Sequence, residues 1–153
     1  MDIPDLRKKA DSGSPVAQSI LGICYLNGID VDANYSGAFR LLSVAKTSRA
    51  VVNLARMYAE GLGIPKDMVQ AIRLYKAVVK VEFRAQIELG RIYSRGDDVP
   101  VDLQQALKWY SAAAALDENN YGSDAATAVL AGSATQQEIR EAKEYVAKSL
   151  RHP

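Results

Sequence analysis

Catalytic chemistry in this sequence would have to start from its one histidine and its one cysteine. His152 lies one residue before the end of the chain, and Cys24 has no basic residue beside it to lower the pKa of its thiol. A nucleophile needs a base within hydrogen-bond reach, so these two residues do not suggest a catalytic pair. We expect His152 to lie in a frayed terminus and Cys24 to be a buried or half-buried thiol.

Two further clusters could bind a phosphate or a metal ion. The run Gly61-Leu62-Gly63 is glycine-rich, but no Gly-Lys-Ser/Thr follows it and its flanks have a helical pattern. Asp97, Asp98 and Asp102 could hold a hard cation, but they lack the alternating ligands and closing Glu of an EF-hand. We interpret both clusters as turn and cap residues. The sequence therefore predicts no catalytic residue, no metal site, no cofactor and no small-molecule substrate, and the protein is not expected to be an enzyme.

The charge balance and the apolar pattern argue against other classes of function. The 153 residues include 19 Lys and Arg against 18 Asp and Glu, so a net charge of +1 does not attract nucleic acid or an anionic membrane. No run approaches the roughly 18 apolar residues of a membrane span. The first residues do not have the pattern of a secretory signal. A cytoplasmic location is expected, or a periplasmic one if a signal peptide has been removed.

The elements that would position any functional residue are clearest between residues 50 and 80. Ala50, Leu54 and Tyr58 recur at i, i+4 and i+8, which places them on one stripe of a helix. The pattern stops at the glycines and proline of residues 61–65 and resumes at Ala71 and Tyr75. This stretch predicts a helix, a tight turn and a second helix.

The same pattern occurs before and after this stretch. An offset of 33 residues separates Ala17 from Ala50, and one of 35 separates Ala50 from Ala85. The three copies align Ala17, Leu21, Gly22, Tyr25 and Gly28 with Ala50, Leu54, Ala55, Tyr58 and Gly61, and with Ala85, Leu89, Gly90, Tyr93 and Gly96. A period in the mid-thirties with two helices per unit predicts an α-solenoid, because one hairpin cannot bury its apolar face alone.

These residues give the chain a family resemblance. The pattern Ala-x3-Leu-Gly-x2-Tyr-x2-Gly, followed by a turn and a second Ala-containing helix, resembles the Sel-1-like repeat, a relative of the tetratricopeptide repeat. The resemblance covers about residues 14–116 and implies an all-α solenoid of antiparallel helix hairpins in a right-handed superhelix. The chain departs from the family where residues 46–48 and 80–82 join successive repeats without the usual glycine.

The repeats divide the chain into segments of one expected repeat domain, residues 1–153. Residues 2–13 form an N-terminal capping helix, and the repeats occupy residues 14–46, 47–80 and 81–117. A degenerate fourth repeat and a C-terminal capping helix are expected in residues 118–150. The capping box from Thr135 to Glu138 marks the start of the last helix.

Candidate functional residues are those on the first helices that the packing stripe does not use. In repeat one these positions are mostly apolar, with Ile20 and Ile23, whereas the later repeats carry arginine there. If the solenoid curves as its relatives do, they line a concave groove suited to a protein or peptide with apolar and acidic groups. The predicted partner-binding residues are Asn27, Asn53, Arg56, Met57, Glu60, Glu88, Arg91, Ile92 and Arg95.

Other interpretations of these rows remain open. They could be ordinary solvated helix faces with pairs such as Glu88 and Arg91. The absence of interleaved aromatic residues argues against single-stranded nucleic acid as the partner. We expect a non-catalytic protein interaction module, a scaffold or adaptor. The family resemblance implies one alternative, a bacterial immunity protein that neutralises a secreted toxin. A neighbouring gene that encodes a toxin whose lethality this chain suppresses would distinguish the immunity protein from an adaptor.

Overall fold

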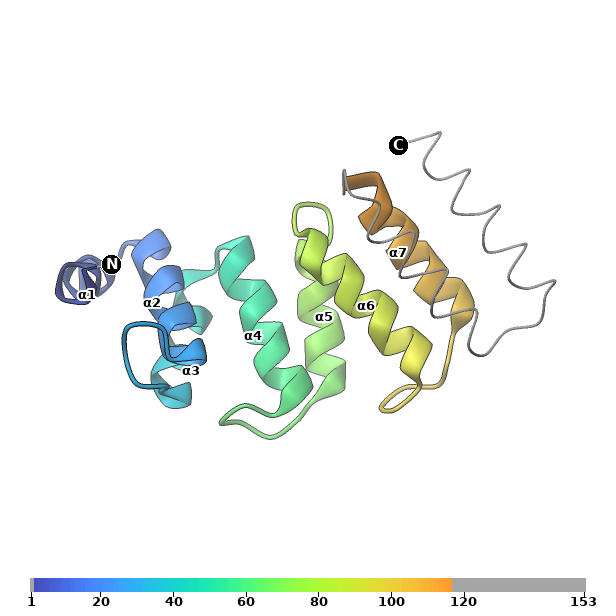
Figure 1. Ribbon diagram of the computed structural model, residues 1–153, viewed down its shortest axis with the longest axis horizontal. Helices are drawn as coiled ribbons and strands as arrows, with labels where there is room; N and C mark the ends of the chain where they lie inside the picture. The colour runs from blue at the N-terminus through green and yellow to red at the C-terminus, as the bar shows by residue number, and fades with distance from the viewer. Residues whose placement is uncertain (1, 117–153) are drawn as a thin grey trace. The chain divides into compact units, whose positions relative to one another are not determined.

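The computed structural model describes residues 2–116, and every element in that part of the chain is a helix (Figure 1). The chain divides into two compact units, Met1–Glu82 and Phe83–Pro153, and each is described by itself. The first unit contains α1 (Ile3–Asp11), α2 (Pro15–Asn27), α3 (Tyr35–Ala45), α4 (Ser48–Glu60) and α5 (Met68–Val78). The described part of the second contains α6 (Phe83–Arg95) and α7 (Leu103–Leu116).

The helices pair as the repeats predict. The partners are α2 with α3, α4 with α5, and α6 with α7, while α3 and α2 both contact α4 within the first unit. The prediction of an all-α solenoid of helix hairpins is confirmed. The expected fourth repeat and C-terminal cap lie outside the described residues.

Caps and left-handed glycines fix where the helices begin and end. Side-chain oxygens of Ser14, Asn34 and Asp67 accept hydrogen bonds from backbone amides in the first turns of α2, α3 and α5. Gly28 and Gly61 follow α2 and α4 with φ values of 65° and 67°, a conformation that costs glycine little. The interpretation of Gly61 as a turn residue from the sequence is therefore confirmed.

The hairpins close because a small residue on the first helix faces a large one on the second. A Cβ atom added to Gly22 of α2 would lie 2.9 Å from Cδ2 of Leu42 on α3. In the second unit, a Cβ on Gly90 would lie 2.6 Å from Cε1 of Tyr110. Tyr110 is 2% exposed, so the close approach lets it bury almost its whole ring, an area worth several kcal/mol at about 25 cal/mol per Å².

Helix α1 closes the N-terminal end of the stack on α2. Its inner side buries Ile3, Leu6 and Ala10. Its other positions are mostly charged and exposed, and Lys9 pairs with Asp5 at 2.8 Å. Such a polar outer side is typical of the capping helices of repeat arrays.

The joint between the first two repeats compensates for its missing glycine in two ways. Lys46 itself adopts the left-handed conformation, with φ 56°. Thr47 then caps α4 by accepting from the Ala50 amide, and its hydroxyl lies 2.6 Å from the hydroxyl of Ser19 on α2. Because the Ser19 hydroxyl donates to Pro15 O, the Thr47 hydroxyl donates to Ser19 and links the two repeats.

The joint at residues 80–82 uses a different turn. The amides of Val81 and Glu82 both donate to Val78 O, at 3.1 and 3.0 Å, without a left-handed residue. The Glu82 carboxylate accepts a 2.7 Å hydrogen bond from the Ser48 hydroxyl at the start of α4.

None of the helices from residue 3 to residue 116 is long and apolar enough to cross a bilayer.

The left-handed conformation of Lys46 leads to a stability prediction. Replacing Lys46 with glycine should raise the free energy of unfolding by about 0.5–1 kcal/mol, because it removes the Cβ from a left-handed residue. Urea unfolding monitored by circular dichroism measures the change. Lys46→Ala keeps the Cβ and serves as the control, with an expected change within about 0.5 kcal/mol. Equal stabilisation by both substitutions would contradict the explanation.

Candidate functional site

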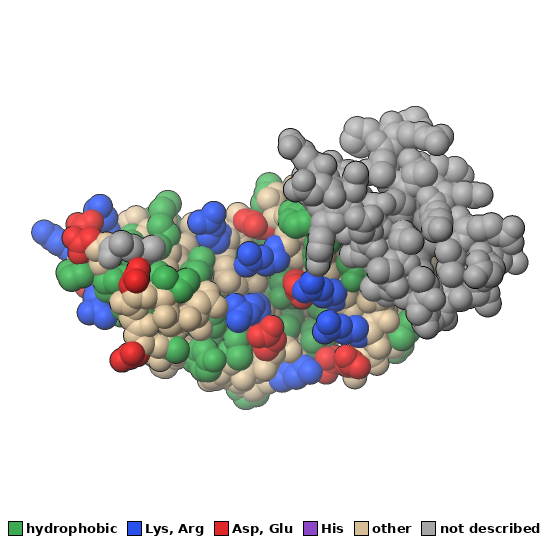
Figure 2. Space-filling view, in the orientation of Figure 1, with side chains coloured by type: hydrophobic (Ala, Val, Ile, Leu, Met, Phe, Trp, Pro, Cys, Tyr) green, Lys and Arg blue, Asp and Glu red, His purple; other side chains and the backbone are tan. Residues whose placement is uncertain are grey.

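An accessible row runs along one side of the first helices of unit 1. Its positions are spaced i, i+4, i+7 and i+11, which places them on one side of each helix. On α2 the row is apolar up to its last residue, and on α4 it is mostly charged. Figure 2 shows the same change, with uncharged side chains over α2 and basic and acidic ones over α4. The residues are Val16, Ile20, Ile23 and Asn27 on α2, and Arg49, Asn53, Arg56 and Glu60 on α4.

Three of the predicted site residues meet where this row reaches the C-terminal ends of α2 and α4. The Arg56 Nη1 donates to Asn27 Oδ1 at 3.0 Å, across from α4 to α2. The Arg56 Nε donates to Glu60 Oε2 at 3.3 Å, one turn further along α4. The Arg56 side chain is 37% exposed, so the guanidinium is held in place and still reaches solvent. We call Asn27, Arg56 and Glu60 the arginine cluster.

Two of the predicted site residues are buried, although Asn53 stands at one of the positions of the row. Met57 is 0% exposed and packs in the core with Ala50, and Asn53 is 4% exposed. The Asn53 Nδ2 donates to Arg49 O at 2.8 Å, which satisfies that group inside the helix. The expectation that these two residues contact a partner is corrected here. The physical reason is that α4 packs against α2 and α3 as well as α5, so its buried side is wider than one stripe.

Helix α6 of the second unit has a row at the equivalent positions of its own sequence. Arg91 Nη1 donates to Glu88 Oε1 at 2.7 Å, and their side chains are 40% and 30% exposed. Arg95 is exposed and Ile92 is half-buried. The Glu88–Arg91 pair inferred from the sequence is therefore confirmed, and in this helix all four predicted residues keep some accessible surface.

The buried Tyr110 reaches the same part of α6 from α7. Its pKa is raised by burial, and this effect outweighs a side-chain hydrogen bond with Ser94 and the positive charge of Arg91. A phenol with a raised pKa stays neutral at ordinary pH. Tyr110 therefore contributes a fixed, uncharged ring behind the α6 row and no acid–base chemistry.

The sequence analysis missed the first position of each row. Val16 is 64% exposed on α2, while Arg49 and Arg84 are exposed at the equivalent places on α4 and α6. Extending the row by one helical turn toward the N-terminus of each helix would have found all three. The missed positions strengthen the contrast, because valine stands on α2 where the other two helices carry arginine.

The residues considered for catalysis have no arrangement that supports it. Cys24 is 2% exposed in the core, and burial is the main cause that raises the pKa of its thiol. A raised pKa leaves less thiolate at neutral pH, so the nucleophilic form is disfavoured. From residue 2 to residue 116, no three His, Cys, Asp or Glu side chains gather in a group that could hold a metal ion. His152 lies outside the described residues.

Comparison with known proteins identifies the repeats. The family model described as Sel1 repeat matches residues 15–46, 48–77 and 83–118. These matches correspond to the three hairpins of the structure, α2 to α7. No curated protein matches the chain.

Two solved structures are similar to this chain. A Sel1 repeat protein from Oxalobacter formigenes is 37% identical, and the match covers 82% of this chain and 96% of that protein with a TM-score of 0.64. A protective antigen of uropathogenic Escherichia coli strains that displays an SLR fold is 24% identical, with a TM-score of 0.78. That match covers 95% of this chain and 32% of the antigen, and at this identity it shows the fold alone.

The arginine cluster leads to a prediction about energetic coupling. In a double-mutant cycle, Asn27→Ala and Arg56→Ala should show a coupling of about 0.5 kcal/mol, as expected for an exposed hydrogen bond from a charged donor to a neutral acceptor. Chemical unfolding of the four proteins gives this value. The cycle of Asn27→Ala with Arg49→Ala is the control, since no hydrogen bond joins those two side chains in the structure, and it should be additive. Additivity in both cycles would show that Asn27 does not hold Arg56.

Proposed function

This chain belongs to the Sel1 repeat family, and on that basis we propose that it is a non-catalytic scaffold or adaptor that binds a protein partner on its first helices. Sel1 repeat proteins generally mediate protein–protein interaction, and their fold is a non-catalytic repeat scaffold. The binding surface that we assign in the first unit is the accessible row on α2 and α4. The corresponding row on α6 in the second unit is a separate candidate surface.

The arginine cluster is the observation that carries this proposal. Asn27 and Glu60 accept from Nη1 and Nε of Arg56, which leaves N–H groups on Nη1 and Nη2 directed to a partner. A guanidinium held in this way loses little side-chain entropy when a carboxylate binds to it. The apolar side chains of Ile20 and Ile23 are half-buried on the neighbouring α2. The row is therefore complementary to a segment that carries an acidic side chain beside an aliphatic one.

The charged side chains in this row contribute little to the stability of the fold. Ion pairs that are as exposed as Arg56 and Glu60 contribute about 0–1 kcal/mol to the free energy of unfolding, and dissolved salt screens them. The hairpins instead depend on buried small and large residues such as Gly22 and Leu42. A surface that the fold does not need is free to serve recognition. The α6 row offers the same chemistry through Arg91 and Arg95.

Site-specific photo-crosslinking tests where the partner binds. A benzophenone amino acid at Val16, which is 64% exposed on α2, should give a crosslinked complex in cells, and mass spectrometry identifies the protein captured. The matched control is Val44, which is 59% exposed on α3 and lies off the row. Crosslinks to the same protein from both positions with equal yield would contradict the assignment of the surface.

Charge reversal provides a second test of the same surface. The triple variant Arg56→Glu, Arg91→Glu and Arg95→Glu should lose capture of the crosslinked protein at least about 100-fold, because each former cation now repels the partner's carboxylates. Its free energy of unfolding should fall by no more than about 1 kcal/mol per site. The matched control reverses Arg40, Arg73 and Lys80, which are exposed and lie off the row. Undiminished capture by the first variant would refute the proposal.

A further inference from the structure

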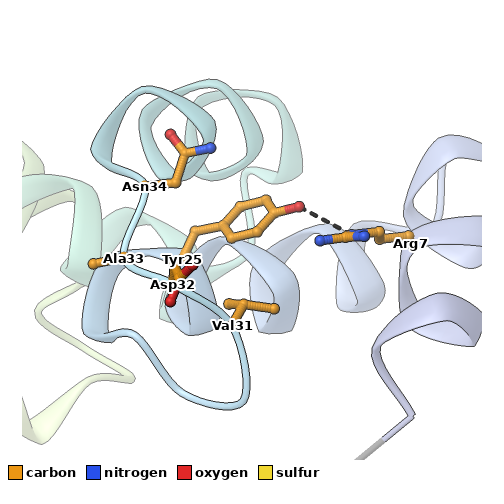
Figure 3. Close-up of a pocket in the computed structure, with 6 residues that line it drawn as sticks. All are labelled: Arg7, Tyr25, Val31, Asp32, Ala33 and Asn34. Carbon is orange, nitrogen blue, oxygen red and sulfur yellow. Dashed lines mark hydrogen bonds between the residues drawn. The ribbon is translucent and has the colours of Figure 1, made fainter.

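A pocket of about 430 Å³ lies beside Tyr25 in the first unit, away from the arginine cluster (Figure 3). Helix α1 provides one wall and the turn after α2 the other. Its volume is in the lower part of the range of known ligand sites, enough for one or two amino-acid residues. It is lined by Arg7, Tyr25, Val31, Asp32, Ala33 and Asn34.

The pocket exists because of a difference between the first two repeats. Tyr58 of α4 packs edge-to-face on Phe39 of the preceding second helix, with ring centroids 6.1 Å apart. At Tyr25 of α2, the preceding helix is α1, and the contacting residue is Arg7. A guanidinium does not seal the space beside the tyrosine ring as a phenyl ring does. The end of the stack therefore keeps an opening with a cation in its wall.

The walls of this pocket are ordered before any ligand binds. The Asn34 amide donates to Tyr25 O at 2.8 Å, which ties the turn to the end of α2. The Asn34 Oδ1 accepts from the Gly37 amide at 2.9 Å, so its side chain is fixed as the cap of α3. Left-handed residues at Gly28 and Asp30 shape the turn between them. Binding to such a preformed site costs little ordering entropy.

The chemistry of the lining selects a ligand. The Arg7 Nε donates to the Tyr25 hydroxyl at 3.1 Å, and its Cζ lies 5.9 Å from the ring centroid. This contact orients the guanidinium across the tyrosine and leaves its Nη groups to bind an anion. Figure 3 shows Arg7 at the hydroxyl end of Tyr25, Ala33, Asp32 and Asn34 toward the other end of this side chain, and Val31 beside the ring. The pocket thus combines one cationic donor with a mostly polar lining, in which Val31 and Ala33 are the aliphatic side chains.

Asp32 limits which anion can bind. Its carboxylate belongs to the same lining, so it repels a dianion such as phosphate about twice as strongly as a monoanion at the same distance, while an N–H group of the ligand would find an acceptor. We infer that the pocket binds the α-carboxylate of an amino-acid residue, either the C-terminal residue of a peptide or a free amino acid. In this assignment, Arg7 binds the carboxylate, Val31 and Ala33 contact the side chain, and Asp32 accepts an N–H.

An NMR titration of the full chain tests this inference with defined probes. The acid peptide acetyl-Gly-Gly-Leu and free leucine are each added to ¹⁵N-labelled protein, together with the C-terminal amide of the same peptide as a negative control. At least one of the two acids should shift the backbone amides of residues 31–34 in a saturable way, and the amide should bind at least about tenfold more weakly. Saturation by the peptide acid alone assigns a peptide C-terminus, and saturation by leucine alone assigns a free amino acid.

Two variants on α1 identify the role of Arg7. Arg7→Gln should weaken binding of the acid about 10- to 100-fold, as expected for loss of a charge-assisted hydrogen-bond pair. Lys8→Gln removes the same charge from the next exposed residue and should bind as the natural sequence does. Equal binding of the acid and the amide, unchanged binding by Arg7→Gln, or no saturable shift at residues 31–34 would each overturn the inference. The Arg56→Glu variant should bind the acid normally, so the result is independent of the proposed surface on α2 and α4.

Discussion

The close contact between a small residue on each first helix and a large residue on the second is the constraint on which this structure depends. Gly22 leaves room for Leu42, and Gly90 leaves room for Tyr110, so the large side chain of the second helix packs directly against the glycine of the first helix. The helices between residues 3 and 116 are only 9 to 14 residues long, too short to be stable alone in water. Their stability comes from this packing and from the neighbouring hairpin, which explains why the repeat is the unit of the fold.

This way of packing also determines where function can reside. Each first helix in the first unit is covered by its own second helix and by the helices of the neighbouring repeats, which leaves one narrow row accessible. On α2 that row is apolar, and on α4 it carries arginines, one of which is held by Asn27 from the adjacent helix. The repeats thus keep the same backbone and buried residues while the row varies, which is how repeat proteins acquire different partners on one scaffold. The end of the stack provides a second kind of variation, since Arg7 takes the place that Phe39 occupies one repeat later.

Much of the fold was predictable because its signals are local. Residues such as Ser14, Asn34 and Gly61 act on the backbone within a few positions, so their types and spacing give the starts and ends of helices directly. The buried stripe followed from the same spacing.

The candidate site was less predictable. Asn53 and Met57 stand at helix positions that a single stripe leaves outside, yet both are buried, because the width of the buried side depends on how many neighbours a helix has.

By itself, the sequence determined the family, the three hairpins and the position of each turn, since glycine, proline and capping residues act over short distances and recur with the repeat. Only the tertiary structure decided which side chains meet. Asn27 and Arg56 are 29 residues apart and Arg7 and Tyr25 are 18 apart, and no local pattern relates them. Lys46 is a further example, because its left-handed backbone follows from the need to turn α3 into α4 without a glycine. The physical reason is that these contacts depend on the distances and angles between packed helices, which arise from the summed packing of many residues.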